Sequence, residues 1–249
     1  MRKRRKTNKL LSGYGWKGKQ ELKYFKPTAA QSGQYNRLDF TTDLCNDTAS
    51  SQYCVPILCN AITQGSDVTQ REGRQVKMKY LEIEGSINPP TSYVHQVSQN
   101  LIHENVRMLV VVDHANNQTT TPPPLNIILD CGASAAAASM QSQNNLDYRK
   151  RFTILVDKIQ NFGWGSSQGG GGTQAITIKE KVQLNMTVNY GAVSTSGSPP
   201  VSNDGTQGTI SDNAVWIYLF AREQGVDATA GITNLYRHIV INPRLRFTE

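Results

Sequence analysis

Between residues 176 and 190, apolar and polar side chains alternate almost without a break. The alternation is broken only at Glu180, and the intervening positions hold Thr, Lys, Gln or Asn. A period of two is that of a β-strand with one face in the core and the other in water, so this segment predicts a long strand. The apolar positions are Ile176, Ile178, Val182, Leu184, Met186, Val188 and Tyr190.

Residues 76–87 also alternate, but the apolar parity changes between Met78 and Leu81. One inserted residue reverses the face on which the side chains lie, so we expect a β-bulge near Tyr80 and Leu81. Residues 235–247 alternate again, and Pro243 within them indicates an edge position or a bulge.

Three shorter runs, 106–112, 152–156 and 215–221, are apolar at both parities. Such runs are typical of central strands that are covered on both faces. Segments 21–25 and 38–42 are weaker strand candidates near the start of the chain.

Composition and loop pattern agree with an all-β fold. Ser, Thr, Asn and Gln account for 76 of 249 residues, and these types are weak in helix interiors but common on strand faces and in turns. Exposed loops are expected at 119–124, 163–172 and 196–208, and the Ala-rich stretch 133–139 predicts one short helix. We therefore predict a single eight-stranded antiparallel jelly-roll sandwich over residues 19–249, with no internal repeat.

The positive charge lies almost entirely at the start of the chain. Residues 1–30 hold ten basic residues and one acid, Glu21, whereas the remainder holds 16 basic and 18 acidic residues. Residues 1–18 lack hydrophobic periodicity and contain three glycines, so we predict a disordered basic arm. A basic arm of this kind binds a polyanion, serves as a nuclear-import signal, or is a solvated tail.

Aromatic residues in the arm favour the first of these interpretations, because aromatic rings stack on unpaired bases while neighbouring cations neutralise phosphates. Packing of the two rings under the folded body is the alternative. The candidate nucleic-acid-binding residues are Arg2, Lys3, Arg4, Arg5, Lys6, Lys9, Tyr14, Trp16, Lys17 and Lys19.

Motifs for catalysis, metal binding and membrane insertion are absent from the sequence. The four cysteines have no CxxC spacing, the four histidines are scattered, and no HExxH, GxSxG or phosphate-binding glycine motif occurs. Asp113-His114 is an acid–imidazole pair in sequence, but a loop cap is the simpler interpretation. The longest bulky apolar run, residues 108–112, is far shorter than the roughly 20 residues of a membrane span. We expect no enzyme activity, cofactor, metal, secretion signal or membrane insertion.

Several sequence blocks, in their order along the chain, resemble the capsid proteins of circular Rep-encoding single-stranded DNA (CRESS-DNA) viruses, a grouping that includes circoviruses and geminiviruses. The blocks are the basic start, 19–25, 64–74 with the strand that follows, 106–113, 145–155 with Asp157-Lys158, and 242–247. The resemblance implies a jelly roll that forms an icosahedral shell around circular single-stranded DNA. It also implies host nuclear import machinery as a partner, and the virion and the host nucleus as locations.

Five charged residues within the matching blocks are candidates for inter-subunit or nucleic-acid contacts, with simple surface solubility as the alternative. They are Arg71, Glu72, Arg149, Lys150 and Arg151. Two other classes of protein stay open at this point. One is a non-viral nuclear β-sandwich that binds nucleic acid, and the other is a jelly-roll enzyme or lectin.

Overall fold

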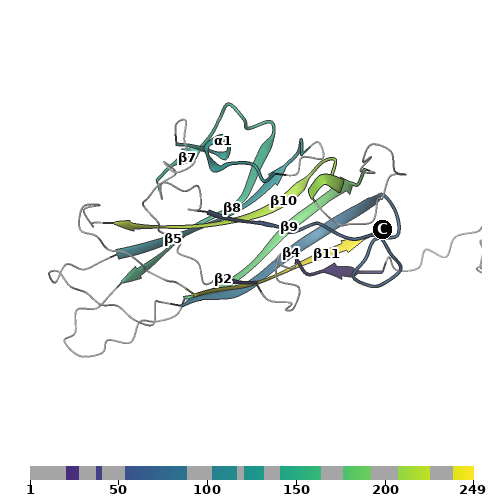
Figure 1. Ribbon diagram of the computed structural model, residues 1–249, viewed down its shortest axis with the longest axis horizontal. Coiled ribbons are helices and arrows are strands. Elements are labelled where there is room, and N and C mark those ends of the chain that lie inside the picture. The colour runs from purple at the N-terminus through teal and green to yellow at the C-terminus, as the bar shows by residue number, and fades with distance from the viewer. Residues whose placement is uncertain are drawn as a thin grey trace, which may run out of the picture.

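The computed structural model describes residues 21–27, 38–40, 54–88, 103–116, 121–131, 141–163, 176–191, 207–224 and 238–249. Two antiparallel sheets lie face to face (Figure 1). Sheet A contains β1 (Lys23–Phe25), β2 (Leu38–Phe40), β4 (Gln75–Asn88), β9 (Ile176–Asn189) and β11 (His238–Thr248). Sheet B contains β3 (Cys54–Leu58), β5 (His103–Asp113), β8 (Phe152–Gly163) and β10 (Ala214–Gln224).

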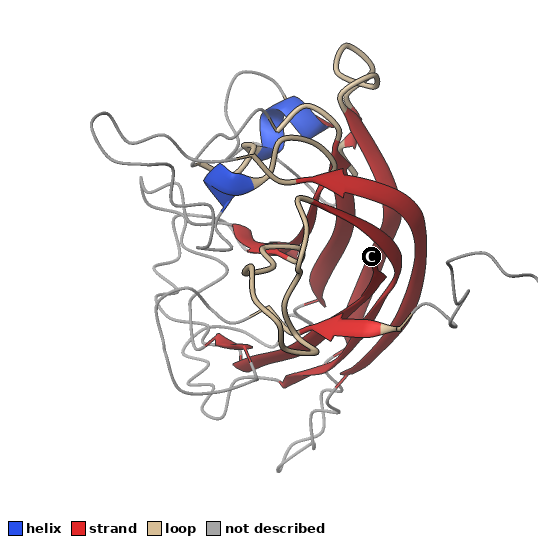
Figure 2. Cartoon of the chain, turned by 90° about the vertical axis from the view of Figure 1, so that its right-hand side faces the viewer, coloured by secondary structure: helices blue, strands red, loops and turns tan. Residues whose placement is uncertain are grey.

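The remaining elements are short. Strands β6 (Leu129–Asp130) and β7 (Gln143–Asn144) form a two-stranded ribbon, and α1 (Leu125–Ile128) precedes it. A 3-10 helix, η2 (Gln207–Thr209), precedes β10, and both helical segments lie on the same side of the molecule (Figure 2). The helix expected at 133–139 and most of the expected loop residues lie outside the described residues.

The strand pairs are nested along the chain. Strand β1 pairs with β11, β3 with β10, β4 with β9, and β5 with β8, all antiparallel. Additional pairs, β11 with β4 and β10 with β5, complete sheet orders of β1-β11-β4-β9 and β3-β10-β5-β8. The predicted all-β antiparallel sandwich is confirmed, and its four main pairs are nested from the ends of the chain inward.

The predicted alternation defines one wall of the core. On β9, Ile178, Val182 and Val188 are buried, and Val182 lies opposite Leu81 of β4. Glu180, the break in the pattern, lies where the β9 and β8 edges of the two sheets meet, and its carboxylate accepts a hydrogen bond from Lys158 of β8. Glu180, which breaks the alternation in the sequence, therefore forms an ion pair between the two sheets.

The predicted bulge is also present. The register of β4 against β9 shifts between Met78 and Tyr80, so that Met78, Leu81 and Ile83 are all buried despite their different parities. Asn185 of β9, beside this shift, adopts a positive φ of 46°, a conformation that asparagine tolerates better than most residues.

Two of the three runs expected to be central have that position. Strands β5 and β10 lie inside sheet B, but β8 lies at its edge, so the expectation for 152–156 is wrong. The outer face of sheet B is covered by residues 121–131, a segment we call the strap. Leu125, Ile128 and Leu129 of the strap are buried, and the Tyr218 hydroxyl donates to the Pro123 carbonyl at 2.8 Å. An apolar run at both parities therefore indicates that both faces of a strand are covered. It does not indicate that another strand is paired at each of its edges.

Pro243 lies in an internal strand with a local edge. Strand β11 lies between β4 and the pair β1 and β2. Strand β2 pairs with residues 239–241 of β11 and β1 with residues 245–247, so within the described chain Pro243 faces the gap between them. A residue without an N–H is tolerated at such a gap. A register shift in β11 is also present, between Arg246 and Phe247.

Candidate nucleic-acid interface

The outer face of sheet A carries a concentration of positive charge that we call the basic face. Alternation places the polar side chains of β4, β9 and β11 on this face, opposite the core. Two carboxylates, Glu82 and Glu84, accompany the cations there. Its cations are Lys77, Lys179, Lys181, Arg244 and Arg246.

The strand register brings these cations into rows across the sheet. Arg244 of β11 lies opposite Glu82 of β4, which lies opposite Lys181 of β9. Glu82 is shared between two cations, since its carboxylate lies 3.7 Å from Arg246 Nε and 4.0 Å from Lys181 Nζ. These separations are long for ion pairs on a partly exposed surface, so Glu82 neutralises the basic face only in part.

Aromatic rings are interleaved with the cations. Lys181 Nζ lies 4.1 Å from the centre of the Tyr80 ring. The guanidinium carbons of Arg246 and Arg244 lie 5.5 and 6.0 Å from the centre of the Tyr24 ring. Rings beside cations are the two elements from which non-specific single-strand binding surfaces are built.

Two arginines on this face have unused hydrogen-bonding capacity. The Nε atoms of Arg244 and Arg246 are buried and have no hydrogen-bond partner within the described parts of the chain. Buried donors are normally satisfied, and guanidinium groups suit the paired oxygens of a phosphate. An anionic ligand on the solvent side of sheet A can reach the exposed cations Lys77, Lys179 and Lys181, whereas these two Nε atoms are buried beneath that surface.

The start of the described chain is fixed at the edge of the same sheet. Lys23 of β1 is buried, and its ammonium lies 3.0 Å from Glu72 and 3.5 Å from Glu249. Burial lowers the pKa of Lys23, but the hydrogen bond to Glu72 and the charges of both carboxylates outweigh it, so the pKa is raised overall. This contact holds the root of the arm beside β11. The ten arm residues named above lie outside the described residues, and their role stays a prediction.

Arg71 is not a surface residue, and its interpretation as a contact residue is wrong for the folded chain. Its side chain is fully buried, and its guanidinium donates to the carbonyls of Ile62 and Gly73. The guanidinium carbon also lies 4.3 Å from the centre of the Tyr190 ring. Arg71 holds the loop between β3 and β4 against the end of β9.

The other four predicted contact residues have different environments. Glu72 is exposed and is paired with Lys23. Arg149 and Lys150 are exposed in the turn before β8. Arg151 is bound by both oxygens of the buried Asp113, at 2.9 and 3.0 Å, which raises the pKa of Arg151. Arg151 therefore anchors the turn, whereas the other three side chains are accessible.

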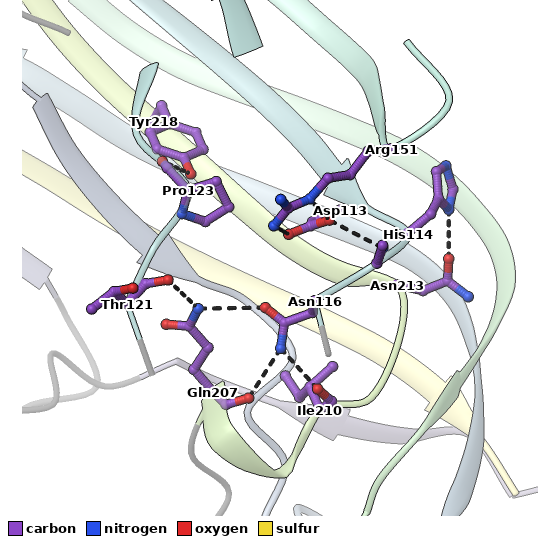
Figure 3. Close-up of polar contacts among 11 residues, drawn as sticks. Asp113, His114, Asn116, Thr121, Pro123, Arg151, Gln207, Ile210, Asn213 and Tyr218 are labelled. Carbon is purple, nitrogen blue, oxygen red and sulfur yellow. Dashed lines mark hydrogen bonds and ion pairs between the residues drawn. The ribbon is translucent and has the colours of Figure 1, made fainter. Parts of the chain in front are cut away.

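The end of the sandwich near Asp113 holds a network of polar contacts (Figure 3). Asn116 donates to the carbonyls of Gln207 and Ile210, and the Gln207 amide donates to the Thr121 carbonyl. These bonds join the chain after β5 to the segment before β10. The network therefore holds these two segments together.

Asp113 and His114 are not an acid–imidazole pair, because Asp113 binds Arg151 and the backbone N–H of Ala115. The His114 ring nitrogens lie 2.6 Å from Asn213 Oδ1 and 2.9 Å from Thr153 Oγ1. Asp113 therefore caps the loop, as the simpler interpretation predicted.

The described residues include no group of three or more His, Cys, Asp or Glu side chains placed to hold a metal ion. Cys59 is buried, and burial raises the pKa of its thiol. No helix in the described ranges combines the length and the hydropathy needed to cross a bilayer.

No family model matches this chain, and no curated protein matches its sequence. A functional assignment therefore rests on the chain's own chemistry, and above all on the basic face. Sequence reasoning placed Lys179 and Lys181 on a wet strand face but did not join them to Arg244 and Arg246. The missing information was which strands are neighbours.

Proposed function

We propose that the protein is the capsid protein of a CRESS-DNA-like virus, which self-assembles into an icosahedral shell and packages circular single-stranded DNA. The observation that carries the proposal is the basic face, with its interleaved tyrosines, beside the root of a strongly basic arm. In this proposal the predicted basic arm and the basic face both contact the packaged nucleic acid.

The difference between the two outer faces of the sandwich supports this proposal. Within the described parts of the chain, the strap packs on the outer face of sheet B, whereas the outer face of sheet A carries the basic face. A shell protein that packages a polyanion needs cations on the inward side, and its phosphate contacts need no sequence readout. Sheet A is the inward side in this proposal.

The proposed partners follow from the same assignment. They are further copies of the chain, single-stranded DNA, and host nuclear import receptors that recognise the basic arm. The proposed locations are the virion and, during assembly, the host nucleus.

The test compares particles made by the full chain with particles made by residues 19–249. After nuclease treatment, the full chain should sediment as a large particle with an elevated 260/280 nm absorbance ratio. Removal of residues 1–18 should leave the far-UV spectrum unchanged, because β1 begins at Lys23. The truncated chain should lose most of the protected nucleic acid, because seven of the ten cations that lie before residue 27 are removed with residues 1–18.

Two results would contradict the proposal. A full-length chain that elutes as a monomer and binds nucleic acid would favour the non-viral nuclear module instead. Particles that protect as much nucleic acid without residues 1–18 would show that the arm is not a packaging element.

A further inference from the structure

Exposed large apolar side chains in the described part of the chain fall into two pairs and one isolated residue. Leu146 and Tyr148 are 70 % and 43 % exposed, Leu22 and Val68 are 43 % and 44 % exposed, and Ile159 at 47 % stands apart. The first pair lies among basic residues, and the second pair lies among acidic residues.

The first pair lies in the turn before β8, and we call residues 145–151 the basic turn. Arg149 and Lys150 are exposed beside the two apolar side chains, with Asp147 as the acid between them. Apolar side chains with adjacent cations suit a complementary surface that is apolar and acidic.

The second pair lies where β1 runs beside the loop between β3 and β4. The backbone N–H of Tyr24 donates to the Val68 carbonyl at 3.2 Å, and this bond holds the two segments together. Exposed acids are chain neighbours of the apolar pair, since Glu21 precedes Leu22 and Asp67 precedes Val68, and the exposed cation of this loop is Arg74. This acidic patch consists of Glu21, Leu22, Asp67, Val68 and Glu72.

The basic turn is held rigidly before any partner arrives. Asn145 donates through its backbone N–H to the Ile128 carbonyl at 2.9 Å and through its amide to the Asn126 carbonyl at 3.3 Å. At the other end, Phe152 N–H bonds the Tyr148 carbonyl and Arg151 binds Asp113. A surface that is already ordered loses little conformational entropy on binding.

We infer that the basic turn of one copy docks on the acidic patch of a second copy. The two surfaces differ, so the contact is heterologous: it uses one patch from each subunit and continues around a ring. The inference rests on the proposed function for self-assembly and adds which surfaces meet.

The first test is a charge exchange. Arg149→Glu with Lys150→Glu places two new acids opposite the three acids of the patch, and the fraction of subunits in particles should fall by about tenfold or more. Adding Glu21→Lys and Asp67→Lys to the same chain should restore particles, because the attraction is re-formed with reversed signs. Glu72 is left unchanged, because it binds the buried Lys23. Ile159→Asp is the matched control and should assemble like the parent.

The second test is a cross-link. Chains with both Leu146→Cys and Val68→Cys should give a ladder of disulfide-linked oligomers on a non-reducing gel. Chains with either substitution alone should give none and so control for the native cysteines. A disulfide-linked dimer from Leu146→Cys alone would show that identical surfaces meet and would overturn the inference.

The outcomes separate this inference from the proposed function. If the reversed turn assembles normally, or the fourfold variant fails to recover, the contact is wrong while packaging stands. If the parent chain forms no particles, both are overturned. Unassembled Leu146→Ser subunits should bind oligo-dT like parent subunits, because the basic face is untouched.

Discussion

Removing two cations from the basic face should weaken DNA binding more than removing two cations elsewhere. The variant is Lys179→Gln with Arg244→Gln, which changes one residue on β9 and one on β11 of the same face. The matched control is Arg74→Gln with Lys158→Gln, which makes the same change in net charge in the β3–β4 loop and on the β8 edge.

The expected size follows from counterion release. Each phosphate contact to single-stranded DNA contributes about −0.7 to the slope of log K against log salt. Two lost contacts make the slope shallower by about 1.4, which is about 25-fold in affinity at 0.1 M salt relative to 1 M, or about 2 kcal/mol. The control should change the slope by less than about 0.3 if its cations make no contact.

The assay is fluorescence anisotropy of a labelled oligo-dT at four salt concentrations, with subunits of each variant in the same state of assembly. Equal slopes and equal losses for the variant and its control would refute the reasoning. Binding would then follow net charge and not the arrangement of side chains on sheet A.

Three further predictions concern stability. Arg71→Met should lower the free energy of unfolding in urea by about 3 kcal/mol or more, because it leaves buried carbonyls without donors, whereas Arg74→Met on the same loop should cost at most about 0.5 kcal/mol. Val182→Asp should cost several kcal/mol by burying a carboxylate, and Gln183→Asp on the wet face about 0.5 kcal/mol or less, which thermal melts will compare. The raised pKa of Lys23 means that its contribution is complete below about pH 10.4 and is lost as pH rises through the higher folded-state pKa. Melting temperatures measured from pH 9 to 11.5 should therefore fall less steeply for Lys23→Gln than for the parent.

The strands that sequence alone could predict are those whose signal is local. The alternation around Val182 depends only on which side chains face water, and the structure bears it out. Strand β3 gave no such signal, because it is short and contains Pro56, which an edge strand tolerates. The edge position of β8 was not predictable either, since its apolar side chains reflect partial cover of both faces.

The candidate site also depends on long-range pairing, which local sequence patterns do not show. The polar parity of Lys181 and the block containing Arg244 were both visible in the sequence. Their assembly into one face depends on β4 lying between β9 and β11, which is a long-range pairing. Arg71 is the opposite case. A cation in a polar loop is typical of a surface, but Arg71 is buried against Tyr190, a residue that follows β9 and is distant from Arg71 in the sequence.

The central claim is that this chain is a shell subunit that encloses nucleic acid on its basic side. Electron microscopy of the purified, nuclease-treated full-length protein, with light scattering on the same sample, tests it most directly. We expect closed particles of uniform diameter with internal density, which disappears when nucleic acid is removed. A stable 27.5 kDa monomer at high concentration, without bound nucleic acid, would contradict the claim.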